Sequence, residues 1–176
     1  MKPERGMRMI RATSLGFLVF CCGNVSAQTA LEKEPIAILE IGGSPDWTFS
    51  GAGFSMSPTV AVETTPIEHW LELEMGTTPT FSNGSTEWDT DLLFKKPWTL
   101  SKKAEVMFGV GPVWINVRNR GMTTNSVGGE AALDFMFWPT ARHRFGWYLE
   151  PGYQYSFASH AQSIGISGGL LIGIQR

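Results

Sequence analysis

The sequence predicts an all-β fold, an eight-stranded antiparallel up-and-down β-barrel of the transmembrane kind. Three observations lead to this prediction. Apolar and polar residues alternate over several separate segments, which is the period of strands with two different faces. The first 27 residues have the features of an export signal. No later segment is apolar over the roughly 20 residues that a spanning helix needs, so a membrane protein of this sequence must cross as a closed barrel.

The N-terminus combines a basic stretch, a short apolar core and a small-residue cleavage site. Lys2 and Arg5 begin the basic stretch, residues 15–22 form the apolar core, and Val25-Ser26-Ala27 offers the cleavage site. This order is typical of a Sec signal peptide, and its apolar core is too short for a membrane anchor. We therefore expect a signal peptide over 1–27, a polar lead over 28–35 and a barrel domain over 36–176.

The segment 127–138 shows the alternation most clearly. Leu133 and Phe135 fall on one face, whereas Glu130 and Asp134 fall on the other. Its length matches the roughly 9 to 11 residues that a tilted strand needs to cross a membrane. Seven further segments resemble it. In chain order, the expected strands cover 36–43, 59–64, 68–78, 86–95, 104–117, 127–138, 144–155 and 163–174.

The expected connections are rich in turn-forming residues. Residues 44–55 are rich in Gly, Ser and Pro and predict a loop, and Asn83-Gly84 accepts the positive φ values of a hairpin turn. Residues 96–103 contain Pro97 and predict a polar turn, residues 118–125 predict a polar loop, and residues 139–143 predict another short turn. An even number of strands places both chain ends on the same side of the barrel.

The acidic residues share one face of the predicted sheet, opposite few basic partners at Lys95, Arg142 and Arg144. Enclosed in a lumen, so much like charge is costly unless it is paired, protonated or bound to cations. Two interpretations follow: a cation-binding or cation-conducting interior, or a hydrogen-bonded polar plug in a barrel too narrow to conduct. By parity this face carries Glu40, Glu63 and Glu105, together with the main candidate cluster of Glu72, Glu74, Glu87, Asp89, Asp91, Glu130, Asp134 and Glu150.

Alternation alone leaves open which face points outward. Glycines on the acid face and aromatic residues near strand ends favour a lipid-facing apolar surface. Trp70 and Trp138 fall on the acid face by parity, which predicts that they plug the lumen. The alternative is a soluble periplasmic, lipocalin-like barrel with an apolar ligand inside. Its cavity would be lined by Leu71, Leu73, Leu92, Phe94, Phe108, Leu133, Phe135, Trp147 and Ile166.

Composition excludes several other classes of function. Four of the 14 basic and one of the 16 acidic residues lie in 1–27, so the mature net charge is −5 and no basic stripe exists for nucleic acid. Both cysteines, Cys21 and Cys22, lie in the signal, which leaves no thiolate ligand. The three histidines lack metal-ligand spacing. We expect no metal, no cofactor, a monomer and no partner beyond outer-membrane lipid and a surface or envelope component.

One catalytic arrangement can be drawn from the sequence. His160 with Ser159 or Ser163, oriented by Glu150, would form a nucleophile, a base and an orienting acid, as in a lipid A deacylase. The order His160-Ala161-Gln162-Ser163 in a predicted loop departs from the His-x-Ser strand pattern of those enzymes. We therefore expect no catalytic activity and keep this esterase as a distant alternative.

The signal, the strand count and the alternation together resemble the superfamily of small bacterial outer-membrane β-barrel proteins, over residues 28–176. The segments 85–103 (STEWDTDLLFKKPWTLSKK) and 143–153 (HRFGWYLEPGY) are also similar to a family of uncharacterised exported barrel proteins. The resemblance implies an outer-membrane barrel with a structural or surface-interaction role. It implies no biochemical activity.

Overall fold

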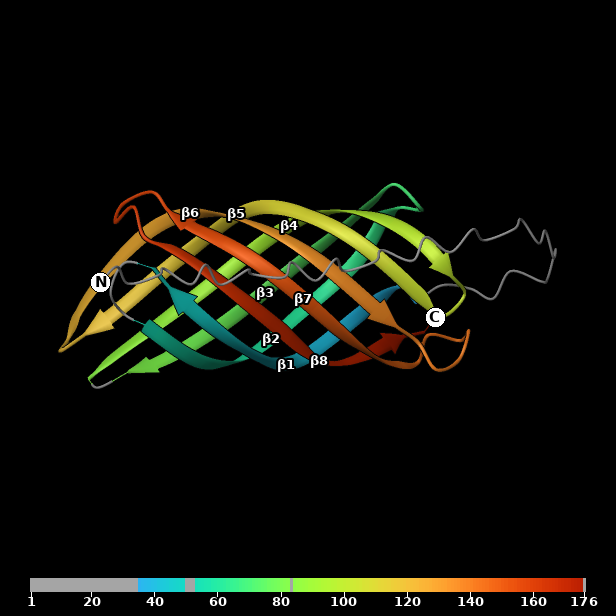
Figure 1. Cartoon of the computed structure of the whole chain (residues 1–176), viewed down its shortest axis with the longest axis horizontal. Coiled ribbons are helices and arrows are strands. Elements are labelled where there is room, and N and C mark those ends of the chain that lie inside the picture. The colour runs from blue at the N-terminus through green and yellow to red at the C-terminus, as the bar shows by residue number, and fades with distance from the viewer. Residues whose placement is uncertain (1–34, 50–52, 83, 176) are drawn as a thin grey trace, which may run out of the picture. The chain divides into compact units, whose positions relative to one another are not determined.

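The protein, for which we use a computed structural model, is described over residues 35–49, 53–82 and 84–175. These residues form a closed antiparallel barrel in which each strand pairs with the next and the last pairs with the first (Figure 1). The predicted signal peptide and most of the polar lead lie outside the described residues. The strands are β1 (Ala37–Thr48), β2 (Gly53–Ile67), β3 (Leu71–Ser82), β4 (Ser85–Ser101), β5 (Ala104–Asn119), β6 (Met122–Phe137), β7 (Phe145–Ser156) and β8 (Gln162–Ile174).

The barrel closes where β1 pairs with β8. Ala37 lies opposite Ile174, and the antiparallel register continues to Thr48 opposite Ser163. The barrel domain therefore begins and ends on one side, as predicted. We call this side, with the connections after β2, β4 and β6, the terminal end. The opposite side, with the connections after β1, β3, β5 and β7, is the loop end.

Two predicted connections are strand instead. Most of the predicted loop 44–55 belongs to β1 and β2, which pair as far as Thr48 opposite Gly53. The predicted turn 96–103 is largely β4, which continues through Pro97 to Ser101. Proline lacks an N–H and so signals a strand end in sequence. Here the ladder tolerates one missing donor, because Lys96 and Trp98 on either side still have partners on β5.

The predicted loop 118–125 is a two-residue hairpin turn. Asn119 pairs with Met122, so only Arg120 and Gly121 connect β5 to β6. Both have positive φ, 47° and 86°, which is the backbone combination of a type I′ turn. This turn matches the right-handed twist of the strands and lets both extend to the loop end.

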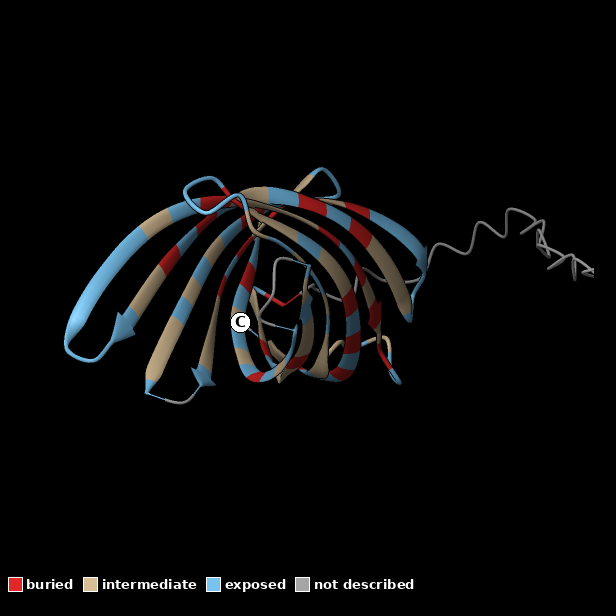
Figure 2. Cartoon of the chain, turned by 60° about the vertical axis from the view of Figure 1, so that its left-hand side comes forward, coloured by how far each residue is buried: buried red, intermediate tan, exposed pale blue. Residues whose placement is uncertain are grey.

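The alternation of faces is as predicted. Along β6, Ala132, Asp134 and Met136 are buried inside the barrel, whereas Leu133 between them is 37% exposed on the outside. Figure 2 shows the same change between buried and exposed positions along the other strands. The acid-bearing face is thus the lumen, and the apolar face is the outer surface.

Glycine leaves room for larger groups in the narrow lumen. A Cβ at Gly111 would collide with the backbone carbonyl of Leu92, and one at Gly109 would meet the side chain of Lys95. Both glycines alternate along β5 with the outward-facing Phe108 and Val110, so they lie on the acid face, where the sequence pattern places glycine. Gly109 in particular leaves space for a long side chain to reach into the interior.

Candidate functional site in the barrel interior

The middle of the lumen holds a buried cluster of charged side chains. The register brings them together: Glu63 lies opposite Glu74 across β2 and β3, and Lys95 lies opposite Glu72 across β3 and β4. Directly opposed like charges are destabilising, so this arrangement needs a counter-charge. The charged cluster comprises Glu40 from β1, Glu63 from β2, Glu72 and Glu74 from β3, Lys95 from β4, Asp134 from β6 and Glu150 from β7.

Lys95 is the only basic residue that is buried within the described ranges, and it lies at the centre of the charged cluster. Its ammonium donates hydrogen bonds to Glu74, to Asp134 at 3.0 Å and to Glu150 at 2.7 Å. Glu63 lies 3.7 Å from Lys95 Nζ, within ion-pair range but beyond a hydrogen bond. An ammonium has three donors, so these three bonds use all of them.

Several carboxylate oxygens of the charged cluster accept no hydrogen bond from any described residue. They are Glu40 Oε1, both oxygens of Glu63 and Asp134 Oδ1. These side chains are at most 2% exposed. Buried polar groups almost always have partners, and an unpartnered buried charge is costly. The charged cluster therefore holds more carboxyl groups than the ammonium of Lys95 can pair with.

Above the charged cluster, a polar cavity of about 530 Å³ extends toward the loop end. Its wall includes Glu40, Glu74 and Glu150 below and residues at the loop-end tips of the strands, such as Thr48 and Ser85, above. Gln154 donates a hydrogen bond of 3.1 Å to Asp89 within it. The remaining acidic residues of the wall are Asp46, Glu87, Asp89, Asp91 and Glu130.

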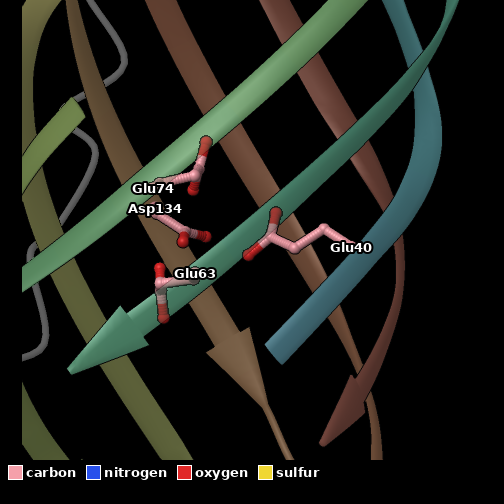
Figure 3. Close-up of side chains that lie close together, drawn as sticks. All are labelled: Glu40, Glu63, Glu74 and Asp134. Carbon is pink, nitrogen blue, oxygen red and sulfur yellow. The ribbon is translucent and has the colours of Figure 1, made fainter. Parts of the chain in front are cut away.

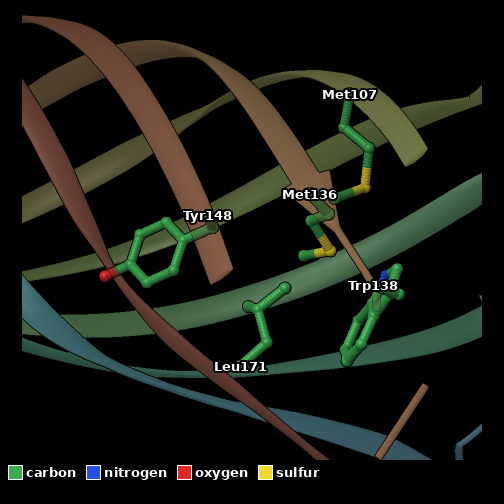
Figure 4. Packing of buried hydrophobic residues seen from close by; sticks show 5 residues of the cluster. All are labelled: Met107, Met136, Trp138, Tyr148 and Leu171. Atoms are coloured by element: carbon green, nitrogen blue, oxygen red, sulfur yellow. The ribbon is translucent and has the colours of Figure 1, made fainter. Parts of the chain in front are cut away.

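Packed apolar side chains adjoin the charged cluster in the lumen toward the terminal end (Figure 4): Leu171 lies opposite Glu40, and Met107 lies opposite Asp134. Met107, Met136 and Leu171 are fully buried, and Trp138 is 2% exposed and stacks on His143 with ring centroids 4.8 Å apart. Tyr148 adds its ring, and its hydroxyl shares a 3.1 Å hydrogen bond with Thr59 in the wall of the cavity. We call these five apolar and aromatic residues the apolar plug. Of its members only Tyr148 lines the cavity, so the cavity does not extend along the other four residues toward the terminal end, which favours a packed interior there over a continuous channel.

Opening the apolar plug tests this conclusion. The double variant Met107→Ser and Met136→Ser removes two fully buried side chains from the terminal end, and we expect it to conduct ions more strongly than the native protein. Eight-stranded barrels have interiors just wide enough for side chains to fill, so side-chain volume there controls the passage. Single-channel recording in planar bilayers measures it.

Met122→Ser is the matched control, because Met122 is 73% exposed at the tip of the β5–β6 hairpin. Its conductance should equal that of the native protein. Equal conductance of the double variant and the control would contradict a sealing role for the two methionines.

The structure divides the predicted acidic cluster between two levels of the lumen. Glu72, Glu74, Asp134 and Glu150 join Lys95 in the charged cluster, whereas Glu87, Asp89, Asp91 and Glu130 line the cavity. The alternation of faces places Glu40 and Glu63 on the acid face with the predicted cluster, but it gives no reason to select them. In the structure both belong to the charged cluster. Of the predicted basic partners, Lys95 is confirmed. Arg142 and Arg144 are exposed in the β6–β7 connection.

The prediction that two tryptophans lie in the lumen is correct for one of them and wrong for the other. Trp138 lies in the apolar plug as expected, but Trp70 is 59% exposed in the turn between β2 and β3. The strand begins at Leu71, and side chains alternate between the two faces only within the strand, so the alternation does not place Trp70.

The three histidines occupy connections rather than a site. His69, His143 and His160 all have positive φ, between 48° and 58°. His160 Nδ1 lies 2.8 Å from the Tyr155 hydroxyl, while Ser159 Oγ donates to Ser156 Oγ at 2.9 Å. Glu150, the proposed orienting acid, is held by Lys95 and Ser167 inside the barrel. The structure does not assemble the drawn nucleophile, base and acid.

The outer surface is apolar between two sets of aromatic residues. Trp88 and Trp114 lie toward the loop end, whereas Trp98 and Trp147 lie toward the terminal end, and each is 45% to 60% exposed. Such belts mark the two interfaces of a bilayer. The lipocalin-like alternative is wrong. The side chains that would line its apolar cavity, such as Phe94, Phe108 and Ile166, are on the outside, and the cavity inside the barrel is lined mainly by polar and acidic residues.

The fold and the surface define a class, the small eight-stranded transmembrane β-barrel. Neisserial surface protein A has this fold, with a TM-score of 0.65 and 11% identity over 78% of this chain and 97% of that one. The N-terminal barrel domain of Pseudomonas aeruginosa OprF gives 0.58 and 12% over 80% and 100%. Ail, the attachment invasion locus protein of Yersinia pestis, gives 0.50 and 10% over 80% and 100%.

At these identities the similarity establishes the fold, which is that of small outer-membrane barrel proteins. No protein-family model matches the sequence, and no curated protein sequence matches it. Within the described residues, no helix has the length and apolar character to cross a membrane.

Proposed function

We propose that the mature chain is a monomeric outer-membrane β-barrel with a structural or surface-interaction role and no catalytic activity. The observation that supports this most directly is the outward placement of large apolar side chains around a closed ladder of strands. A soluble protein rarely exposes such a continuous apolar surface, and lipid removes its cost. All backbone groups of the strands can pair within the closed barrel, as the membrane requires.

The loop end offers the surface for an interaction. The β5–β6 hairpin carries Arg118 and Arg120 at its tip, and Asn125 Oδ1 accepts hydrogen bonds from Asn116 at 2.6 Å and Trp114 at 3.2 Å. One similar barrel, Ail, has been solved with the heparin analogue sucrose octasulfate. We propose that the hairpin tips contact envelope or surface components, without assigning the same ligand to this chain.

Fractionation of cells that express the full chain tests the proposal. We expect the mature protein in the outer membrane, with different gel mobility before and after boiling, because a closed barrel resists unfolding until it is heated. Recovery from the soluble periplasm would contradict it. Loss of lipid A acyl chains that depends on His160, tested with His160→Ala, would contradict the non-enzymatic part separately.

A further inference from the structure

We propose that the charged cluster binds a calcium ion between the carboxylates of Glu40, Glu63 and Asp134. This goes beyond a structural or surface role, because it assigns a ligand to the barrel interior. Four observations support it: the spacing of four carboxylates, the buried oxygens on three of them that lack hydrogen-bond partners, the use of all three Lys95 donors, and the acidic approach from the loop end.

The spacing of the oxygens fits a single ion. Glu40, Glu63, Glu74 and Asp134 each offer one oxygen, and these four atoms lie within 4.8 Å of one another. Figure 3 shows the four side chains pointing toward a common region from β1, β2, β3 and β6. Two oxygens on opposite sides of a calcium ion are separated by about 4.6 to 5.2 Å, because each Ca–O distance is about 2.3 to 2.6 Å. An all-oxygen ligand set also suits calcium, which is a hard cation.

The oxygens available to the ion are those left without a partner. Glu40 Oε1, Glu63 Oε1 and Oε2, and Asp134 Oδ1 accept no hydrogen bond from the described residues. The side chains that carry them are 2%, 1% and 0% exposed. An ion that coordinates these oxygens would replace the solvation that they lose on burial.

Lys95 leaves a place for a second cation. Its three donors are directed to Glu74, Asp134 Oδ2 and Glu150, so no N–H remains for the unpartnered oxygens. Four carboxylates lie within ion-pair distance of this single ammonium. The carboxylates that surround the ammonium would also attract a calcium ion, and this attraction opposes the repulsion between the two cations.

The cavity provides the approach. Glu40 and Glu74 belong both to the charged cluster and to the cavity wall, so the cavity reaches the proposed site. Asp89, Asp91 and Glu130 line the path from the loop end. A cleft lined with one sign of charge and low-dielectric walls raises the local concentration of the opposite ion.

Calorimetric titration of the folded mature barrel in detergent, freed of metal with a chelator, tests the proposal with calcium chloride alone as the probe. We expect one saturable calcium site and a higher temperature for the loss of the unboiled gel mobility when calcium is present. Glu63→Gln and Glu40→Gln should each weaken calcium binding on the order of tenfold or more, because each removes a charged ligand. Glu68→Gln is the matched control, since Glu68 is exposed in the β2–β3 turn, and it should bind as the native protein does.

Two outcomes overturn the proposal. The first is a native protein that shows neither a binding isotherm nor a calcium-dependent change in thermal stability. The second is equal calcium binding by Glu63→Gln, Glu40→Gln and Glu68→Gln, which would place the ion on exposed acids. Unboiled gel mobility verifies that each variant is folded, and either lumen variant suffices if the other does not fold.

Discussion

Replacing Lys95 with methionine is expected to lower the free energy of unfolding by about 3 to 5 kcal/mol, the cost of removing one partner from a buried ion pair. Methionine has similar length, so the volume beside Gly109 stays largely filled. The substitution therefore mainly removes the positive charge. Glu63, Glu74, Asp134 and Glu150, all within 4.0 Å of Nζ, would then face one another without it. Denaturant unfolding of the barrel in lipid vesicles, with a chelator present, measures the loss.

The neighbouring lysine is the control for this prediction. Lys96 points away from the charged cluster and donates a 2.9 Å hydrogen bond to the exposed carbonyl oxygen of His69. Lys96→Met should change the free energy of unfolding by no more than about 0.5 kcal/mol, as surface substitutions usually do. Similar losses from the two substitutions would show that lysine at position 95 contributes nothing special to the interior.

A compensating variant separates charge from packing. Adding Glu74→Gln and Glu150→Gln to Lys95→Met removes two of the carboxylates that the ammonium had balanced, and stability should recover in part. Buried ion pairs replaced as a unit often cost little, whereas breaking one is costly. No recovery in this triple variant would mean that the Lys95 side chain acts through its shape rather than its charge.

The strand number and the two faces could be predicted from sequence because both follow from a local period. Alternation around Leu133 and Asp134 is visible within a few residues, and the export signal, which lies outside the described residues, then favours lipid as the partner of the apolar face. Strand ends were harder to predict. Pro97 reads as a strand breaker in isolation, yet the pairing of its neighbours with β5 carries the strand past it.

Parity gives the face of a residue but not its height in the barrel. Glu63 and Glu87 both fall on the acid face, but Glu63 lies opposite Glu74 in the charged cluster, whereas Glu87 lies opposite Thr80 near the loop end. Height depends on the register between strands and on their stagger around the closed barrel, neither of which is visible in one strand. The meeting of Glu40, Glu63 and Asp134, from three different strands, therefore needed the structure.

Arginine at position 133 is expected to cost about 2 to 4 kcal/mol of folding free energy, the penalty for a basic side chain near the bilayer midplane. Leu133 faces outward beside Phe108 on β5. Along β6 it lies between Val127, which pairs with Trp114 of the loop-end belt, and Phe137, which pairs with Trp147 of the terminal-end belt. The guanidinium of an arginine at this depth cannot reach water at either bilayer interface, so the charge would stay in the apolar part of the membrane.

Ala132, next to Leu133, is the control because its side chain is on the lumen face instead of the lipid face. Ala132 is 2% exposed and points into the lumen, between the acidic positions Glu130 and Asp134 of the same face. Ala132→Ser adds a hydroxyl where acceptors are abundant, so its effect on unfolding in lipid vesicles should be close to zero. Leu133→Arg should in addition reduce the fraction of protein that inserts, because the charge must cross lipid before the barrel closes. Equal tolerance of both substitutions would contradict the assignment of the apolar face to lipid, and with it the membrane-spanning interpretation of the fold.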